Sequence, residues 1–307
     1  MRRHLQLVRA GEHPLGSDAG RAANVAVPDG TVDGVTEAAA GEPTDSLAIA
    51  IDGLAPEQHH LGCHGEPGEH LSHAIGSLRL DGRLALEAQL DQLLALGSGL
   101  PDAAVLLEFD AALVEHVLTL EAPPCAHEGA RPVVLPAYGG AQRQHNLAPL
   151  VALLLQRLGV PVLLHGSLEG IGRAGTAYVL RELGVMPCMT LAGAQAALAA
   201  ERLAFVPTGV LAPGLAQLLA LRNRIGPCAA VQLMARLIDP FRGGSLRIAC
   251  ARSPAELDVL RELLVAAGAD ALLMPATEGE AFANPQRRPR IERVHDGMAR
   301  VLFEQEA

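Results

Sequence analysis

Two glycine-rich turns are the segments of this sequence whose residue types and spacing suggest phosphate chemistry. In PAYGGAQRQHN (136–146), a short apolar run enters Gly139 and Gly140, and a helix-like pattern follows. In the second turn, the apolar run VLLHG ends at His165 and Gly166 before another helix-like pattern. Such turns can direct backbone N–H groups at an anion, helped by the helix dipole. Neither matches a dinucleotide-binding or P-loop pattern, so a plain tight turn is the alternative for each.

Arginines are the second feature that suggests an anionic partner. All 24 basic residues are arginine, so chemistry that needs a lysine is excluded. Four of them crowd the segment NPQRRPRIER, and others lie in LRNRIG and ARLIDPFRGG. Because the guanidinium fork suits phosphate oxygens, we predict that these groups contact the phosphates of an anionic partner. The alternatives are a solvated loop, or ion pairs with Asp239 and its neighbours. The predicted binding residues are Arg222, Arg224, Arg236, Arg242, Arg287, Arg288, Arg290 and Arg293.

Candidate metal ligands are less specific. Glu278 and Glu280 stand close together, and histidines with Cys63 gather between residues 59 and 73. The histidines lack the regular spacing of a zinc site, and their segment shows no sustained periodicity. We therefore predict no metal site.

Charge divides the chain into two parts. Residues 1–130 carry 6 arginines against 20 acidic residues, whereas residues 131–307 carry 18 against 14. The C-terminal part is thus mildly basic within a chain of net charge −10, which favours an anionic partner there. The acidic N-terminal part should repel nucleic acid.

The composition predicts a cytoplasmic protein. No run approaches the roughly 18 uninterrupted apolar residues of a transmembrane helix, and the N-terminus lacks the apolar region of a signal peptide. The five cysteines are scattered and odd in number, which suits a reducing compartment better than a disulfide framework.

Hydrophobic periodicity predicts an α/β fold. Residues 1–80 are rich in Gly, Pro, Asp and His and predict loops, whereas 84–97 and 103–120 predict helices; together they form a smaller N-terminal part, residues 1–130. Within residues 131–307, strand-like and helix-like segments alternate, which predicts a mainly parallel sheet flanked by helices. The expected strands are VPVLLHGS, AFVPT, SLRIAC and DALLMPAT, preceded by VVLPAYGG, a short apolar run that enters a Gly turn.

The order of these segments resembles the anthranilate phosphoribosyltransferase family of the nucleoside phosphorylase type (glycosyltransferase family 3), and within it the TrpD-like, YbiB-type DNA-binding proteins. The resemblance rests on VVLPAYGGAQRQHNLAPLVALLL, GVPVLLHG, LAFVPTGVLAPGLAQLLALRNRIG, QLMARLIDPF and ATEGEAFANPQRRPRI. It implies a small helical domain beside a larger α/β domain, with substrates in the cleft. The family's regular helices are not recognisable in residues 1–80, and its further C-terminal helices would follow VLFEQEA, where the sequence stops. A frameshifted or truncated gene would explain both departures.

The resemblance also implies where a phosphoribosyl site once lay. The family's Gly-Thr-Gly-Gly-Asp loop matches residues 137–141, which keep Gly139 and Gly140 but lose the threonine and the aspartate. Its Lys-His-Gly-Asn-Arg motif matches residues 164–168, where leucine replaces the lysine and the Asn-Arg pair is absent. The residues that match such a site are Gly139, Gly140, Asn146, His165 and Gly166.

The resemblance also matches the family's metal-binding and substrate-binding residues to positions in this sequence. The family's magnesium-binding Asp-Glu pair falls near Glu278 and Glu280, without adjacent acids, and its anthranilate-associated arginine matches Arg222. Loss of the lysine removes a cation that would offset charge on the departing diphosphate. The expectation is a non-catalytic homodimer that binds the DNA or RNA backbone with low sequence specificity, without a cofactor and away from membranes. The alternatives are a magnesium-dependent phosphoribosyltransferase acting on an aromatic acid, or a poorly folded product.

Overall fold

The computed structural model describes residue 80 and residues 99–168, 172–222 and 226–306. A seven-stranded sheet with the order β3-β2-β1-β4-β5-β6-β7 forms its centre. The first five strands pair in parallel, and β6 and β7 add to one end in antiparallel fashion. The predicted α/β class is confirmed. The strands are β1 (Val133–Ala137), β2 (Val162–Gly166), β3 (Leu203–Pro207), β4 (Leu246–Ala251), β5 (Ala271–Pro275), β6 (Ile291–His295) and β7 (Met298–Phe303).

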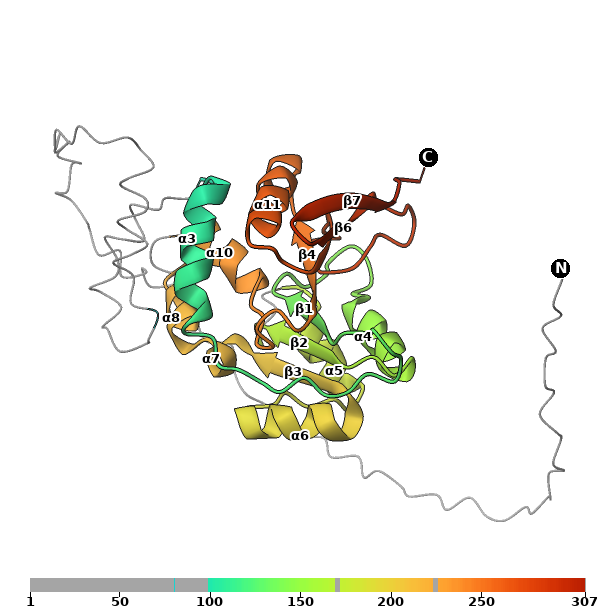
Figure 1. Ribbon diagram of the computed structural model, residues 1–307. Coiled ribbons are helices and arrows are strands. Elements are labelled where there is room, and N and C mark those ends of the chain that lie inside the picture. Colours follow the sequence, from blue (N-terminus) through green and yellow to red (C-terminus); the bar gives the residue numbers. More distant parts are fainter. Residues whose placement is uncertain (1–79, 81–98, 169–171, 223–225, 307) are drawn as a thin grey trace, which may run out of the picture. The chain divides into compact units, whose positions relative to one another are not determined.

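Helices cover both faces of the sheet, as Figure 1 shows. Helices α4 and α5 lie on one face, while α3, α10 and α11 pack on the other. The helices are α3 (Ala103–Val114), α4 (Ala148–Arg157), α5 (Thr176–Glu182), α6 (Leu191–Glu201), α7 (Thr208–Leu211), α8 (Pro213–Ala220), α10 (Ala229–Arg236) and α11 (Pro254–Ala266).

Alternation along the strands divides the apolar residues into two cores. In β1, Val134 belongs to the core beneath α3, α10 and α11, whereas Val133 and Leu135 belong to the core beneath α4 and α5. In β2, Leu163 and Leu164 divide in the same way. Because both faces are covered, these strands read as continuous apolar runs.

Local signals in the sequence explain where several helices begin. Ser253 precedes α11, and its side chain accepts a hydrogen bond of 3.1 Å from the backbone of Glu256. Thr190 caps α6 in the same way through Gly193. Proline stands in the first turn of α4, α8 and α11, where its missing N–H costs nothing.

The helix predicted over 103–120 is wrong at its C-terminal end. It ends at Val114, after which the N–H of Leu118 donates to Leu211 O at 2.7 Å and that of Leu120 to Pro240 O at 3.0 Å. Backbone pairing with distant loops therefore replaces the last helical turn. The predicted helix 84–97 and the predicted loops of residues 1–79 lie outside the described residues, with residue 80 alone described beside them.

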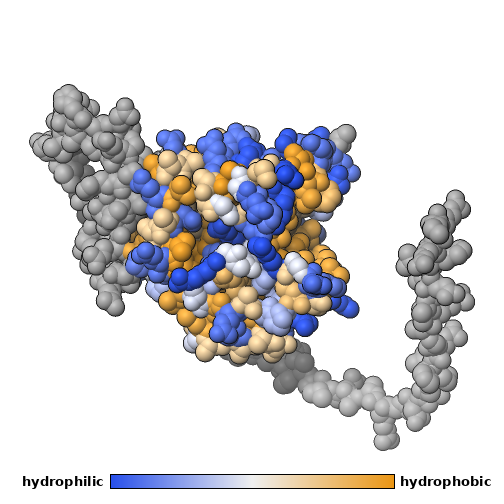
Figure 2. Space-filling model, in the orientation of Figure 1, coloured by the Kyte–Doolittle hydropathy of each residue, from blue (hydrophilic) through white to orange (hydrophobic). Residues whose placement is uncertain are grey.

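The β6–β7 hairpin is not among the predicted strands, the last of which is DALLMPAT. Its turn is Asp296-Gly297, with φ of 50° and 66°. Asp-Gly at such a turn is a strong hairpin signal between alternating apolar residues. As the last strand of the sheet, β7 exposes Met298, Leu302 and Phe303, and Figure 2 shows apolar surface over this strand.

The strand order creates a switch point between β1 and β4. From β1 the chain proceeds to β2 and β3 on one side, whereas β4 and β5 lie on the other. Ligands of open α/β sheets bind at the carboxyl ends of the strands at such a point. The fold therefore places a crevice after β1, β4 and β5.

Among the described residues, no helix combines the length and the apolar composition that a membrane span requires.

We predict that Gly166→Ala destabilises the fold by roughly 2–3 kcal/mol, because it overpacks the β1–β2 contact. A Cβ at this position would lie 1.9 Å from Ala137 O, which belongs to the neighbouring strand. Urea unfolding measures the change. Gly209→Ala is the matched control, since its Cβ would meet only Ala216 at an ordinary 3.8 Å. Equal stability of the two variants would contradict the tight packing of β1 against β2.

Candidate anion-binding cleft

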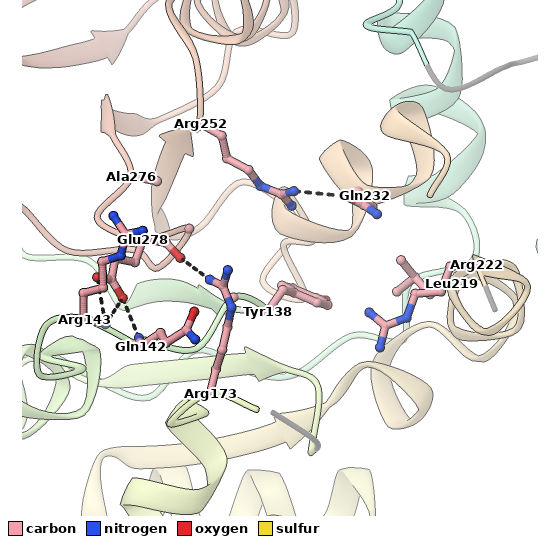
Figure 3. Close-up of a pocket in the computed structure, with 12 residues that line it drawn as sticks. Tyr138, Gln142, Arg143, Arg173, Leu219, Arg222, Gln232, Arg252, Ala276 and Glu278 are labelled. Atoms are coloured by element: carbon pink, nitrogen blue, oxygen red, sulfur yellow. Dashed lines mark hydrogen bonds between the residues drawn. The ribbon is translucent and has the colours of Figure 1, made fainter. Parts of the chain in front are cut away.

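A cavity of about 610 Å³ lies at the carboxyl ends of β1, β4 and β5. Its walls come from the turn after β1, the segment before α5, helices α8 and α10, and the turns after β4 and β5. Figure 3 shows these segments around a common space. The lining residues include Tyr138, Gly139, Gln142, Arg143, Arg173, Leu219, Arg222, Gln232, Arg252, Ala276, Glu278 and Gly279.

Four arginines from different segments line this cavity, and one carboxylate accompanies them. Arg173 donates to the carbonyl oxygens of Gly140 at 3.4 Å and Glu278 at 3.3 Å, and Arg252 donates to Gln232 at 3.1 Å. Burial, followed by the charge of Arg236, lowers the pKa of Arg252. The guanidinium groups of Arg143 and Arg222 have no partner among the residues described. The cavity is therefore strongly cationic.

The glycine turn after β1 already holds an anion that belongs to the chain. The Glu280 carboxylate accepts hydrogen bonds from the backbone N–H of Gly139, at 3.0 Å, and from that of Gly140. Thr176 at the start of α5 donates to its other oxygen at 3.2 Å. Glu280 is buried, and this burial raises its pKa while the hydrogen bonds act against the shift.

A second carboxylate accepts hydrogen bonds from the backbone N–H groups of residues 142–144, which follow the glycine turn. Glu278 accepts from the backbone N–H of Gln142, from that of Arg143 at 3.0 Å to each oxygen, and from that of Gln144 at 3.1 Å. These hydrogen bonds, that of Gln142 foremost, lower the pKa of Glu278. Glu278 and Gly279 form a tight turn with φ of 53° and 90°. This left-handed turn directs the carboxylate onto the amides.

His165 lies behind the cavity in a chain of hydrogen bonds. Thr208 donates to Gly166 O at 3.2 Å, so the hydroxyl of Tyr138, 2.8 Å away, donates to Thr208. His165 Nδ1, at 3.1 Å from the same hydroxyl, must then carry the proton. Nε2 is left as a buried acceptor without a partner among the described residues. Burial lowers the pKa of His165 to about 3, and burial raises that of Tyr138.

Asn146 and Leu164 do not line the cavity but stabilise the structure beside it. The Asn146 amide donates to Ala174 O at 2.9 Å and to Thr176 at 3.0 Å, and its oxygen accepts from Ala148 N at the start of α4. Asn146 thus ties the two glycine-rich turns together. Leu164 is fully buried between the sheet and α4–α5, so the position of the family's lysine faces the core and not the cavity.

The predicted binding arginines do not form one group. Arg222 lines the cavity, and Arg224 lies outside the described residues. Arg236 is buried, pairs with Glu256 and donates to Cys250 O at 2.9 Å. Its guanidinium therefore serves the interior, in an ion pair with Glu256 and not with Asp239, the partner that the ion-pair alternative named.

Arg287 and Arg288 are exposed near the C-terminal end of the described chain. Arg287 donates to Glu306 O at 2.9 Å and lines a shallow depression that shares Ala276 and Glu278 with the main cavity. Arg288 stacks over Phe303 at 5.4 Å. Arg287 thus extends the cationic surface beyond the main cavity, whereas the Arg288 side chain packs against β7.

The other three arginines lie among acidic residues. Arg290 pairs with Glu292 at 3.1 Å, and Arg293 pairs with the buried Asp270. Arg242 lines a second cavity, of about 390 Å³, at the amino ends of the strands. Four aspartates also line that cavity: Asp110, whose pKa burial raises, Asp239, Asp270 and Asp296.

Three cavity arginines, Arg143, Arg173 and Arg252, are absent from the predicted binding residues. Arg143 follows β1 and Arg252 directly follows β4, whereas Arg173 lies before α5. Their position at carboxyl ends of parallel strands was the available signal. Glu278 and Glu280, considered as metal ligands, instead accept backbone N–H groups. Among the described residues, no group of three or more His, Cys, Asp or Glu can hold a metal ion.

The strand order and the cleft at its switch point define a protein with the anthranilate phosphoribosyltransferase fold. The enzyme of Thermus thermophilus superposes with a TM-score of 0.59 at 22% identity, covering 77% of this chain and 69% of that one. The Saccharomyces cerevisiae enzyme in complex with PRPP and Mg superposes with a TM-score of 0.54 at 14% identity, covering 77% and 67%. These likenesses concern the fold. No protein-family model matches the chain.

The chain is homologous to the uncharacterized protein YbiB of Escherichia coli K12 and to anthranilate phosphoribosyltransferases. It is 37% identical to YbiB over 204 residues, which cover 66% of this chain and 63% of YbiB. It is 30% identical to the enzyme of Frankia alni over 153 residues, 47% of this chain and 42% of the enzyme. The predicted resemblance is thus confirmed. The chain spans less than two thirds of the length of these relatives.

We predict that the His165 ring stays neutral, with its proton on Nδ1, from pH 8 down to pH 5. The folded-state pKa of about 3 lies below the ordinary 6.5, so the unfolded chain takes up the proton first. Stability is therefore full above about pH 6.5 and falls by up to ~1.4 kcal/mol per unit as pH decreases toward 3. Long-range ¹H–¹⁵N NMR of the ring reads its protonation and tautomer. A ring that becomes protonated near pH 6.5 would contradict the burial of this group.

Proposed function

We propose that this protein is a non-catalytic nucleic-acid-binding protein that holds the DNA or RNA backbone in the arginine-lined cleft, with low sequence specificity. The observation that carries the proposal is the convergence of Arg143, Arg173, Arg222 and Arg252 on one open cavity. Guanidinium groups bind phosphate oxygens through paired hydrogen bonds, without reading the bases.

The cationic surface extends beyond the cavity, which suits an elongated polyanion. The depression lined by Gln144 and Arg287 shares Ala276 and Glu278 with the cavity, so the two are continuous. Glu278 opposes the arginines, but its charge is already offset by three backbone N–H groups. This revises the sequence-based set of residues: Arg143, Arg173 and Arg252 join Arg222 and Arg287, and the buried Arg236 leaves it.

The same geometry disfavours phosphoribosyl transfer. The amides of the glycine turn are engaged by Glu280, and those of residues 142–144 by Glu278. The carboxylates that match the family's magnesium ligands are thus already engaged by backbone hydrogen bonds. At the position of the family's lysine, buried Leu164 offers no cation to a departing diphosphate. The proposal also includes a cytoplasmic homodimer that uses no cofactor. The homodimer rests on the resemblance alone, and the cytoplasm suits the four free cysteines of the described chain.

Removing two cleft arginines tests the binding site. We predict that Arg222→Ala/Arg252→Ala weakens binding of a single-stranded oligonucleotide at least tenfold, because two phosphate contacts are lost. The salt dependence of binding, as the slope of log K against log salt, should fall by about 1.4. Fluorescence anisotropy across a salt series measures both quantities.

The matched control is Arg157→Ala/Arg181→Ala, which removes the same charge from exposed positions on α4 and α5. This control should bind nearly as tightly as the wild type. Equal losses in the two double variants would show that net charge alone governs binding. Absence of binding by the wild-type protein at low salt would end the proposal.

The alternative function is phosphoribosyl transfer to an aromatic acid. It is favoured by the homology to anthranilate phosphoribosyltransferases and by the retained Gly139-Gly140 and His165-Gly166. Incubation with phosphoribosyl diphosphate, magnesium and anthranilate discriminates the two functions. We expect no diphosphate release above background, and release that depends on anthranilate would replace our proposal with this alternative.

A further inference from the structure

We propose that the backbone amides of Gln142, Arg143 and Gln144 form an oxyanion site that Glu278 fills when no ligand is bound, and that a phosphate group takes the site by displacing this carboxylate. Glu278 would thereby set the affinity of the cleft for phosphate. This inference rests on the proposed function in one respect only: the proposed function names a nucleic-acid backbone as the source of the phosphate.

The first argument is the geometry of the amides. Three consecutive N–H groups converge on one carboxylate, with N–O distances of 3.0 Å for Arg143 and 3.1 Å for Gln144. Successive N–H groups that point into one concavity bind anions, and phosphate oxygens accept such bonds as carboxylate oxygens do. The amides lie before α4, which begins at Ala148, so the turn itself forms the site.

The second argument is that the two glutamates differ in how firmly they are held. Glu280 is only 1% exposed and ties three segments of the fold together, whereas the Glu278 side chain faces the cavity. Hydrogen bonds between the backbones of Thr277 and Glu280, at 3.0 and 3.2 Å, close the turn independently of the Glu278 carboxylate. Rotation of the Glu278 side chain therefore vacates the amides without opening the turn.

The third argument is the charge around the site. Arg173 bonds to the carbonyl oxygens of Gly140 and Glu278, and no ion pair joins an arginine to the Glu278 carboxylate within the described chain. The unpartnered Arg143 guanidinium is thus available to an incoming phosphate or to the displaced carboxylate. The apparent dissociation constant of such a site is the intrinsic value divided by the fraction of time that the carboxylate leaves the site vacant.

Removal of the competing carboxylate tests the inference. Inorganic diphosphate is the probe, and isothermal titration calorimetry measures its affinity for the full chain. Glu278→Ala should bind diphosphate about tenfold or more tightly than the wild type. Glu278→Gln keeps an oxygen on the amides and should gain less. Glu262→Ala removes the same charge from an exposed position on α11 and should match the wild type. Equal affinities of Glu278→Ala and Glu262→Ala would overturn the inference.

A measurement on the wild type keeps the test decisive if Glu278→Ala does not fold. Saturating diphosphate should shift the ¹⁵N–¹H resonances of Gln142, Arg143 and Gln144, whereas binding that leaves these amides unshifted would refute the site. A second arm uses a single-stranded oligonucleotide in place of diphosphate. If diphosphate alone gains from Glu278→Ala, the site serves a free phosphorylated molecule and not the oligonucleotide. If the wild type binds no oligonucleotide at all, the proposed function fails while the inference stands.

Discussion

The buried carboxylate of Glu280 is the interaction on which the cleft depends. It joins the turn after β5 to the glycine turn after β1 through Gly139 and Gly140, and both to the start of α5 through Thr176. A buried carboxylate is costly unless hydrogen bonds satisfy it, so these three segments must stay together in the folded state. Gly139 is required there because a Cβ would lie 2.8 Å from the backbone of Gly279.

This contact decides the electrostatics of the cleft. Glu280 and Glu278 accept hydrogen bonds from backbone N–H groups, so neither carboxylate forms an ion pair with the arginines within the described chain. The arginines are then held apart on separate segments around one opening, as Figure 3 shows. Their mutual repulsion favours an anion among them, and their spread over the cavity suits several phosphates along a chain more than one reacting group.

Much of the fold could be predicted from the sequence, because its strands are continuous apolar runs and several helices begin at a proline or a capping side chain. The end of α3 could not, since the backbones of Leu118 and Leu120 pair with the end of α7 and with Pro240, more than 90 residues away along the chain. The β6–β7 hairpin could have been predicted from Asp296-Gly297 but was not. At the site, the glycine turns were recognised, yet their occupation by Glu278 and Glu280 depends on tertiary contact between loops. Local spacing likewise grouped Arg236 with Arg222, although one is buried with Glu256 and the other lines the cavity.

The central claim is that phosphate groups of a nucleic acid lie among the four cleft arginines. Titration of ¹⁵N-labelled protein with a single-stranded oligonucleotide, observed at the arginine Nε–Hε resonances, tests it most directly. The account predicts shifts of Arg143, Arg173, Arg222 and Arg252, with the buried Arg236 unchanged. Shifts confined to arginines outside the cleft, such as Arg242 or Arg300, would contradict it.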